Sequence, residues 1–152
     1  MLVFAQSVLM FRYPKVKVTI EMKSNVFNTG DSVKFRMILL NNTDTIQKLL
    51  FDKPAGKLFP WGTSVVLKSA SGRLMVEFSN REMLSSQIYS EEQIEKYGYY
   101  YLLTPGQSLS HEYYLPDIAI LKTRDGKLPV GEYRFQISYY LHFSNSTSFS
   151  IK

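Results

Sequence analysis

The chain has 152 residues, a length typical of a single domain that can bury a substantial core. It contains no cysteine, which excludes disulfides, thiolate zinc sites and a cysteine nucleophile. The net charge is +5, but the basic residues are dispersed rather than gathered in a stripe with exposed aromatic residues, so we expect no nucleic-acid partner.

The N-terminal segment 1–14 is apolar up to Arg12 and too short for a membrane span. Residues 3–5, with the sequence VFA, precede Gln6 and match the small-residue end of a secretory signal whose basic start is missing. The alternative is an edge strand that packs on the domain. The signal interpretation favours a secreted or periplasmic location slightly over a cytoplasmic one.

Alternating apolar and polar residues predict strands through the first half of the chain. The predicted strands are 15–23, 32–40 and 46–51, then a hairpin of 63–68 and 73–78 around the turn 69–72. Turn sequences at 28–31 and 41–44 separate the first three strands. The segment 52–62 between the third strand and the hairpin is irregular, with two prolines, two glycines and the only tryptophan.

The segment 90–98 predicts a short helix. Ser90 followed by Gln93 has the form of a capping box, and Glu92 and Lys96 are four residues apart in the favourable order. Gly98 suits the C-terminal end of the helix. We expect this helix to cap one end of the domain.

The second half of the chain predicts strands at 99–103, 108–115 and 148–152, and one long strand at 128–143. One parity of the long strand is entirely apolar, with Tyr133, Phe135, Ile137, Tyr139, Leu141 and Phe143. A strand with one fully apolar face requires a second sheet to cover it. The sequence therefore predicts an all-β fold, an antiparallel β-sandwich of about 7–9 strands with one short helical insertion, as a single domain over 1–152.

Several turn motifs of the chain resemble those of bacterial immunoglobulin-like β-sandwich domains. They are the GDSV sequence at 30–33, the NNT sequence at 41–43, the LTPGQS sequence at 103–108 and the GEY sequence at 131–133. The resemblance implies an immunoglobulin-like sandwich, in which Tyr133 would form a tyrosine-corner hydrogen bond.

Within that group the chain is weakly similar to the intracellular proteinase inhibitor family of Bacillus, through Phe51, 54–56 and the turn 71–73. It departs from that family at 74–76, where a tryptophan is usual and LMV stands here. The resemblance implies proteinase inhibition as an alternative function, through a loop at 52–62 that enters an active-site cleft.

The sequence predicts neither an enzyme nor a cofactor. His111 lies between Leu109 and Tyr113 on the inward face of its strand, which predicts a buried neutral imidazole, and His142 lies on a different strand. This spacing matches no zinc site, and no phosphate loop, nucleophile elbow or acid–base pair is present.

A binding loop is the expected functional feature. Loops held by a rigid scaffold carry binding residues, and tryptophan is enriched at interface anchors. The candidate residues are Leu58, Phe59, Pro60 and Trp61. A lone tryptophan in a sandwich also commonly belongs to the core or covers an open end. The predicted function is a non-catalytic interaction module that binds a protein or a glycan, and a flat row of outward tyrosines would favour the glycan.

Overall fold

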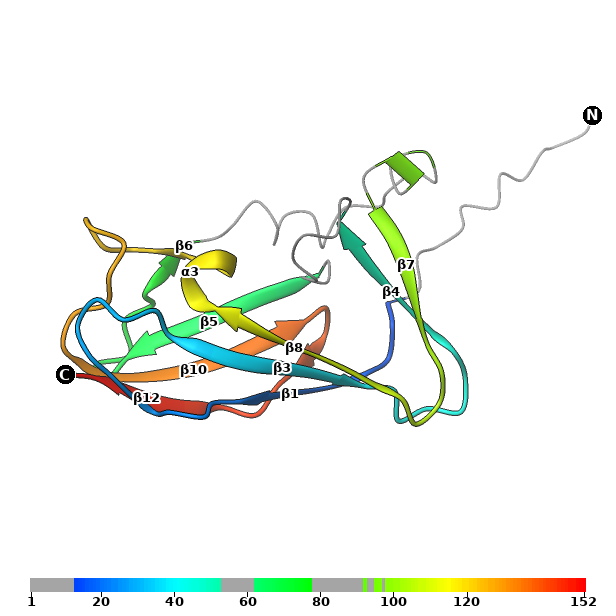
Figure 1. Ribbon diagram of the computed structural model, residues 1–152, viewed down its shortest axis with the longest axis horizontal. Helices are drawn as coiled ribbons and strands as arrows, with labels where there is room; N and C mark the ends of the chain where they lie inside the picture. The colour runs from blue at the N-terminus through cyan, green and yellow to red at the C-terminus, as the bar shows by residue number, and fades with distance from the viewer. Residues whose placement is uncertain (1–12, 53–61, 78–91, 93–94, 97) are drawn as a thin grey trace, which may run out of the picture.

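The computed structural model describes residues 13–52, 62–77, 92, 95–96 and 98–152 (Figure 1). The chain forms an all-β sandwich of the immunoglobulin-like type, as the sequence predicts. Within the described residues, the strands of at least five residues are β1 (Lys17–Glu21), β3 (Lys34–Leu40), β4 (Gln47–Asp52), β5 (Thr63–Ser69), β7 (Gly98–Leu103), β8 (Ser108–Tyr114), β10 (Gly131–Tyr139) and β12 (Thr147–Ile151). Shorter elements are β2 (Val26–Phe27), β6 (Val76–Glu77), α3 (Leu115–Ile118), β9 (Ile120–Leu121) and β11 (His142–Phe143).

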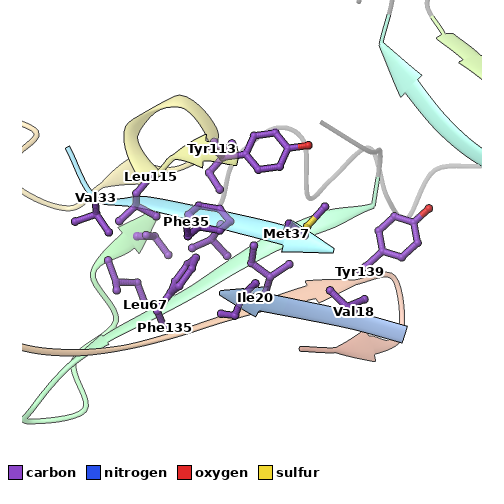
Figure 2. Packing of buried hydrophobic residues seen from close by; sticks show 14 of the residues in the cluster. Val18, Ile20, Val33, Phe35, Met37, Leu67, Tyr113, Leu115, Phe135 and Tyr139 are labelled. Atoms are coloured by element: carbon purple, nitrogen blue, oxygen red, sulfur yellow. The ribbon is translucent and has the colours of Figure 1, made fainter. Parts of the chain in front are cut away.

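One sheet of the sandwich has the strand order β1–β3–β8 and is antiparallel throughout. Alternate side chains of each strand point inward, because successive residues of an extended chain face opposite sides. Ile20 of β1 lies opposite Met37 of β3 in the register, and both side chains are buried in the core (Figure 2).

The other sheet is built around β10. One edge of β10 pairs with β5, and the other edge pairs with β12 and then with β11. The short strand β2 adds to β12 in parallel, a departure from the fully antiparallel sandwich that the sequence predicts. The two sheets meet at Phe35 and Phe135, whose ring centroids lie 4.8 Å apart in an edge-to-face arrangement (Figure 2). Both rings are completely buried, so this contact lies at the centre of the core.

Among the described residues, a side chain rather than a strand pairs with the outer edge of β1. The amide of Asn145 accepts a hydrogen bond from the Ile20 backbone N–H at 2.9 Å and donates one to the Ile20 carbonyl at 3.0 Å. Asn145 lies in the loop between β11 and β12 of the other sheet. It therefore satisfies the edge of β1 and links the two sheets of the sandwich.

Both predicted ends of the long strand at 128–143 are wrong. The strand β10 starts at Gly131 and ends at Tyr139, where Tyr140 adopts a left-handed backbone with φ 49° and the chain reverses into β11. The N–H of Tyr140 donates to the Gly62 carbonyl at 2.8 Å, which helps to hold this turn. Leu141 and Phe143 continue the apolar parity but are 77% and 65% exposed.

The predicted hairpin of 63–68 and 73–78 forms only in part. A single bridge joins Lys68 to Leu74, and β6 then pairs with β9 instead of β5. The strand β5 pairs with β10 along its whole length, and Thr63, Val65 and Leu67 of β5 are buried. The helix α3 at the end of β8 was not predicted; its second residue is Pro116, whose fixed φ suits a first helical turn.

The tyrosine corner is confirmed. The hydroxyl of Tyr133 donates a 2.6 Å hydrogen bond to the carbonyl of Pro129, four residues earlier. Gly131 lies inside this corner with φ +155°, a conformation that residues with a side chain rarely adopt. The corner fixes the direction in which the chain enters β10.

The strands β4 and β7 form a separate antiparallel ribbon, which projects from one end of the sandwich (Figure 1). Asn41 lies where the ribbon leaves the sandwich and is completely buried. Its amide nitrogen donates to the carbonyls of Thr45 and Leu103, each at 2.8 Å. Its amide oxygen accepts from the N–H and the hydroxyl of Thr43. The NNT turn of the sequence thus places the ribbon.

Two predicted segments fall largely outside the described residues. Of the predicted helix at 90–98, Glu92, Glu95 and Lys96 are described and have helical backbone, whereas Gly98 already belongs to β7. Residues 1–12 are outside the description, so the choice between an edge strand and a signal segment for 1–14 stays open. Tyr13, near the end of that segment, is described and packs on Tyr140, with ring centroids 4.9 Å apart.

Candidate functional surfaces

The four residues predicted as the binding site, Leu58, Phe59, Pro60 and Trp61, lie outside the described residues. The loop prediction therefore stays a prediction. The described part of the same region is the β4–β7 ribbon. The strand β4 ends directly before the undescribed segment 53–61, and β7 begins directly after the undescribed residue 97.

The ribbon has two different faces. Leu49, Phe51 and Leu103 point to one face and are buried, and the Phe51 ring stacks on Tyr99 at 5.7 Å between centroids. Because adjacent residues alternate, Leu102 and Tyr100 point to the opposite face. We call this second face the outward face; on the first face, Tyr101 is 38% exposed.

Large apolar side chains are exposed on the outward face. Leu102 is 53% exposed and Tyr100 is 43% exposed. Lys48 lies opposite Leu102 in the register, and its ammonium group lies 5.8 Å from the centroid of the Tyr100 ring. Ile46 immediately precedes β4 with the parity of Lys48 and is 55% exposed. Leu50, opposite Tyr100, is buried, so the exposure is greatest toward Ile46 and Leu102.

The tyrosines of the chain do not form a flat row within the described strands. Tyr100 and Tyr101 are adjacent on β7 and therefore face opposite sides of the ribbon. Tyr114 is exposed on β8 of the sandwich, where the Lys34 ammonium lies 5.7 Å from its ring centroid. Tyr113 is buried, and burial raises the pKa of its hydroxyl. Tyr99 and Tyr101 share the other face of the ribbon, so on its outward face Tyr100 is the only tyrosine of β7.

The prediction of a buried His111 is wrong. The side chain has the inward parity of Tyr113 and contacts its ring edge-on at 4.8 Å between centroids, but it is exposed. It lies on β8, which ends the order of its sheet, so water reaches it from the open side. Among the described residues, no group of three or more histidines and carboxylates could hold a metal ion.

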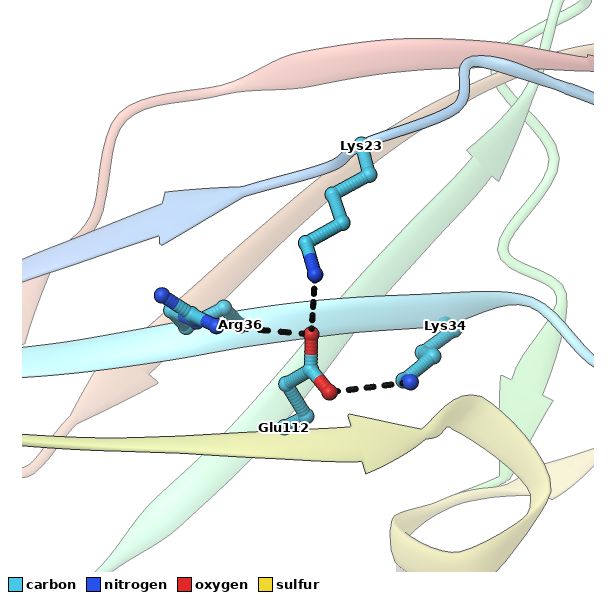
Figure 3. Close-up of polar contacts among 4 residues, drawn as sticks. All are labelled: Lys23, Lys34, Arg36 and Glu112. Atoms are coloured by element: carbon cyan, nitrogen blue, oxygen red, sulfur yellow. Dashed lines mark ion pairs between the residues drawn. The ribbon is translucent and has the colours of Figure 1, made fainter.

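Three basic side chains converge on one carboxylate on the β1–β3–β8 sheet (Figure 3). Glu112 accepts from Lys34 at 2.9 Å, and it also contacts Lys23 at 3.4 Å and Arg36 at 3.5 Å. The hydrogen bond from Lys34 is the main reason that the pKa of Glu112 falls to about 2. Glu112 is therefore ionised throughout the physiological pH range.

Sequence reasoning missed both of these surfaces. The sequence predicts a strand at 99–103, but nothing in that prediction showed that Leu102 and Ile46 would share the exposed face of a projecting ribbon. The three cations come from two places in the sequence, at 23 and at 34–36, and Glu112 is more than seventy positions further along. Only the antiparallel register of β3 and β8 brings Arg36 opposite Glu112.

No protein-family model and no curated protein matches the chain. Among solved structures it is similar to the β-glucosidase from Listeria innocua, with 12% sequence identity and a TM-score of 0.51 over 91% of this chain and 16% of that enzyme. It is also similar to the β-glucosidase EmGH1 from Erythrobacter marinus, with 12% identity and a TM-score of 0.52 over 92% of this chain and 16% of that one. A further similarity is to the CARDB domain of the PF1109 protein from Pyrococcus furiosus, with 12% identity and a TM-score of 0.42 over 96% and 95% of the two chains.

The likenesses to the two β-glucosidases show the fold alone. The chain spans about 16% of the length of each enzyme, so in them a similar fold makes up one part of a much longer chain. In this chain, no helix among the described residues is both long and apolar enough to cross a membrane.

Proposed function

We propose that this chain is a non-catalytic interaction module that binds its partner through the outward face of the β4–β7 ribbon. The observation that carries the proposal is the exposure of Ile46, Leu102 and Tyr100 on one face of a projecting element. Single exposed apolar residues are ordinary, but a group of them on one face is typical of an interaction surface.

The composition of this face favours a protein partner over a glycan. Two branched aliphatic side chains and one tyrosine are suited to filling the pockets of another protein surface. Glycan binding would use a coplanar aromatic platform, and of the three consecutive tyrosines of β7 only Tyr100 lies on the outward face. Lys48 over the Tyr100 ring adds a cation at the border of the apolar patch, in the position of a polar rim.

The proposal is tested by comparing two double variants of the chain. The ribbon variant carries Tyr100→Ala and Leu102→Ser. The control variant carries Leu141→Ser and Phe143→Ala, which remove two side chains of equal or greater exposure from the β10–β11 hairpin. Both variants change the surface only, so we expect melting temperatures within about 2 °C of the parent.

Each protein is immobilised and exposed to an extract of the source cells and to a panel of soluble polysaccharides. We expect the parent and the control variant to retain the same polypeptide, and the ribbon variant to lose it by at least about tenfold, as loss of an interface anchor produces. Equal retention by the ribbon variant would place the contact elsewhere. Retention of a polysaccharide and of no polypeptide would replace the protein partner with a glycan.

A further inference from the structure

A hollow lies beside the Glu112 cluster, and no residue of the β4–β7 ribbon lines it. The crossover from β1 to β2, which carries the chain from one sheet to the other, forms one side of it. The hollow has a volume of about 270 Å³. It is lined by Glu21, Lys23, Ser24, Phe27, Lys34, Phe35, Arg36 and Glu112. Aromatic rings thus contribute to its lining, together with charged side chains.

The basic side chains around the hollow are accessible. The side chain of Lys23 is 82% exposed, and those of Lys34 and Arg36 are 43% and 40% exposed. Glu112 contacts all three, since its carboxylate receives one contact from each (Figure 3), and the Lys34 ammonium also lies near the Tyr114 ring. Glu21 is the second carboxylate of the lining. Three cations therefore face two carboxylates, and the hollow carries an excess of positive charge.

We propose that this hollow receives an acidic segment of a partner protein, with a carboxylate at the three cations and an adjacent apolar side chain against Phe27. Phe27 is half-buried and packs edge-on against Phe149, with 5.8 Å between centroids, so one side of its ring is already supported. The volume lies near the lower limit of the range of about 300–1,000 Å³ typical of small-molecule and cofactor pockets, and it suits one or two side chains.

The same observations disfavour a nucleic acid as the occupant. A phosphate backbone is bound by a stripe of unpaired cations that follows it. Here the cations are gathered on one carboxylate, and the hollow beside them has aromatic residues in its lining. An acidic peptide matches both features, because it carries charge and an apolar side chain within two residues.

In this arrangement Glu112 positions the cations and also competes with the ligand for them. Replacement of Glu112 by glutamine removes the negative charge and releases the three basic side chains. The Glu112→Gln variant is therefore expected to bind an acidic peptide more tightly than the parent, by about three- to tenfold. A cluster that serves stability alone predicts no such gain.

The test is a titration of the ¹⁵N-labelled chain with the peptide acetyl-Glu-Phe-Glu-Leu-amide, followed by NMR. The reference peptide has glutamine in place of both glutamates. We expect the acidic peptide to shift the amide signals of residues 21–27, 34–36 and 112. Its Kd should rise several-fold between 50 and 300 mM salt, because salt screens the charges. The reference peptide should bind little. Lys34→Ala and Arg36→Ala should each weaken binding by about three- to tenfold, whereas Lys68→Ala on β5, which removes the same charge elsewhere, should leave it unchanged.

Several outcomes would overturn the proposal. They are no binding at millimolar peptide, equal binding of the two peptides, an equal effect of Lys34→Ala and Lys68→Ala, or weaker binding by Glu112→Gln. A short single-stranded DNA that binds at least as tightly as the acidic peptide would assign the cations to nucleic acid instead. Because the ribbon is not part of this surface, loss of either proposal leaves the other standing.

Discussion

Substitution of Asn41 by alanine is expected to destabilise the domain strongly. The side chain is completely buried and makes four hydrogen bonds, two donated to backbone carbonyls and two accepted from Thr43. At about 1 kcal/mol for each net hydrogen bond, with a further cost for leaving the buried Leu103 carbonyl unpaired, the loss is about 4–5 kcal/mol. In a domain of this size that lowers the melting temperature by about 8–20 °C.

A second substitution at this position adds a pH test. Asn41→Asp keeps the acceptor for Thr43 but loses both donors and buries a charge. The new carboxyl would have a folded pKa above its unfolded value, so the variant should recover stability relative to the parent as the pH falls and the carboxyl becomes neutral.

The measurement is urea unfolding of the parent and the two Asn41 variants between pH 3 and pH 8. Asn42→Ala is the matched control, because Asn42 is exposed in the same turn, and it should lie within about 0.5 kcal/mol of the parent. A loss below about 1 kcal/mol in Asn41→Ala, or a difference between Asn41→Asp and the parent that does not change with pH, would refute the reasoning.

Further predictions concern Glu112, Gly131 and Trp61. The lowered pKa of Glu112 stabilises the fold above pH 4.5, the ordinary pKa of this group, and this stabilisation is lost as the pH falls toward about 2. Glu112→Gln should therefore flatten the acid side of a plot of urea midpoint against pH. An unchanged plot would contradict the ion cluster. Gly131→Val should lower the melting temperature by several degrees, because a β-branched residue is strained at φ +155°, and a melt within about 2 °C of the parent would contradict this strain. Trp61 is the only tryptophan, so blue-shifted, poorly quenched fluorescence and a loss of about 3–5 kcal/mol in Trp61→Ala would assign it to the core. Red-shifted fluorescence with an unchanged melt would support the contact loop. Stoichiometric inhibition of a proteinase by the parent but not by Trp61→Ala would establish the inhibitor alternative for 52–62.

The fold was predictable because its strands alternate cleanly. In β1 and β3 every second residue is apolar, and this parity sets both the strand and its buried face. Turn chemistry gave further detail, since Tyr133 forms the hydrogen bond that its motif implies and 41–44 turns the chain between β3 and β4. These features are local, so the sequence alone reveals them.

The errors arise where tertiary contacts override a local pattern. The apolar parity of β10 continues through Leu141 and Phe143, but a turn at Tyr140, which has no glycine or asparagine to signal it, reverses the chain. His111 has the parity of a core residue but lies on the edge strand of an open sheet. Alternation shows which side chains share a face, but not whether another element covers that face.

The most direct test of the interaction module is hydrogen–deuterium exchange of the chain, free and in complex with the polypeptide that it retains. A two-stranded ribbon opens more readily than the sandwich, so its amides should exchange fast in the free chain. We predict that the complex slows exchange in β4 and β7, with the largest effect around Leu102, and leaves the β10–β11 hairpin unchanged. Slowed exchange confined to 53–61 or to the hairpin, with β4 and β7 unaffected, would contradict the assignment of the ribbon as the contact surface.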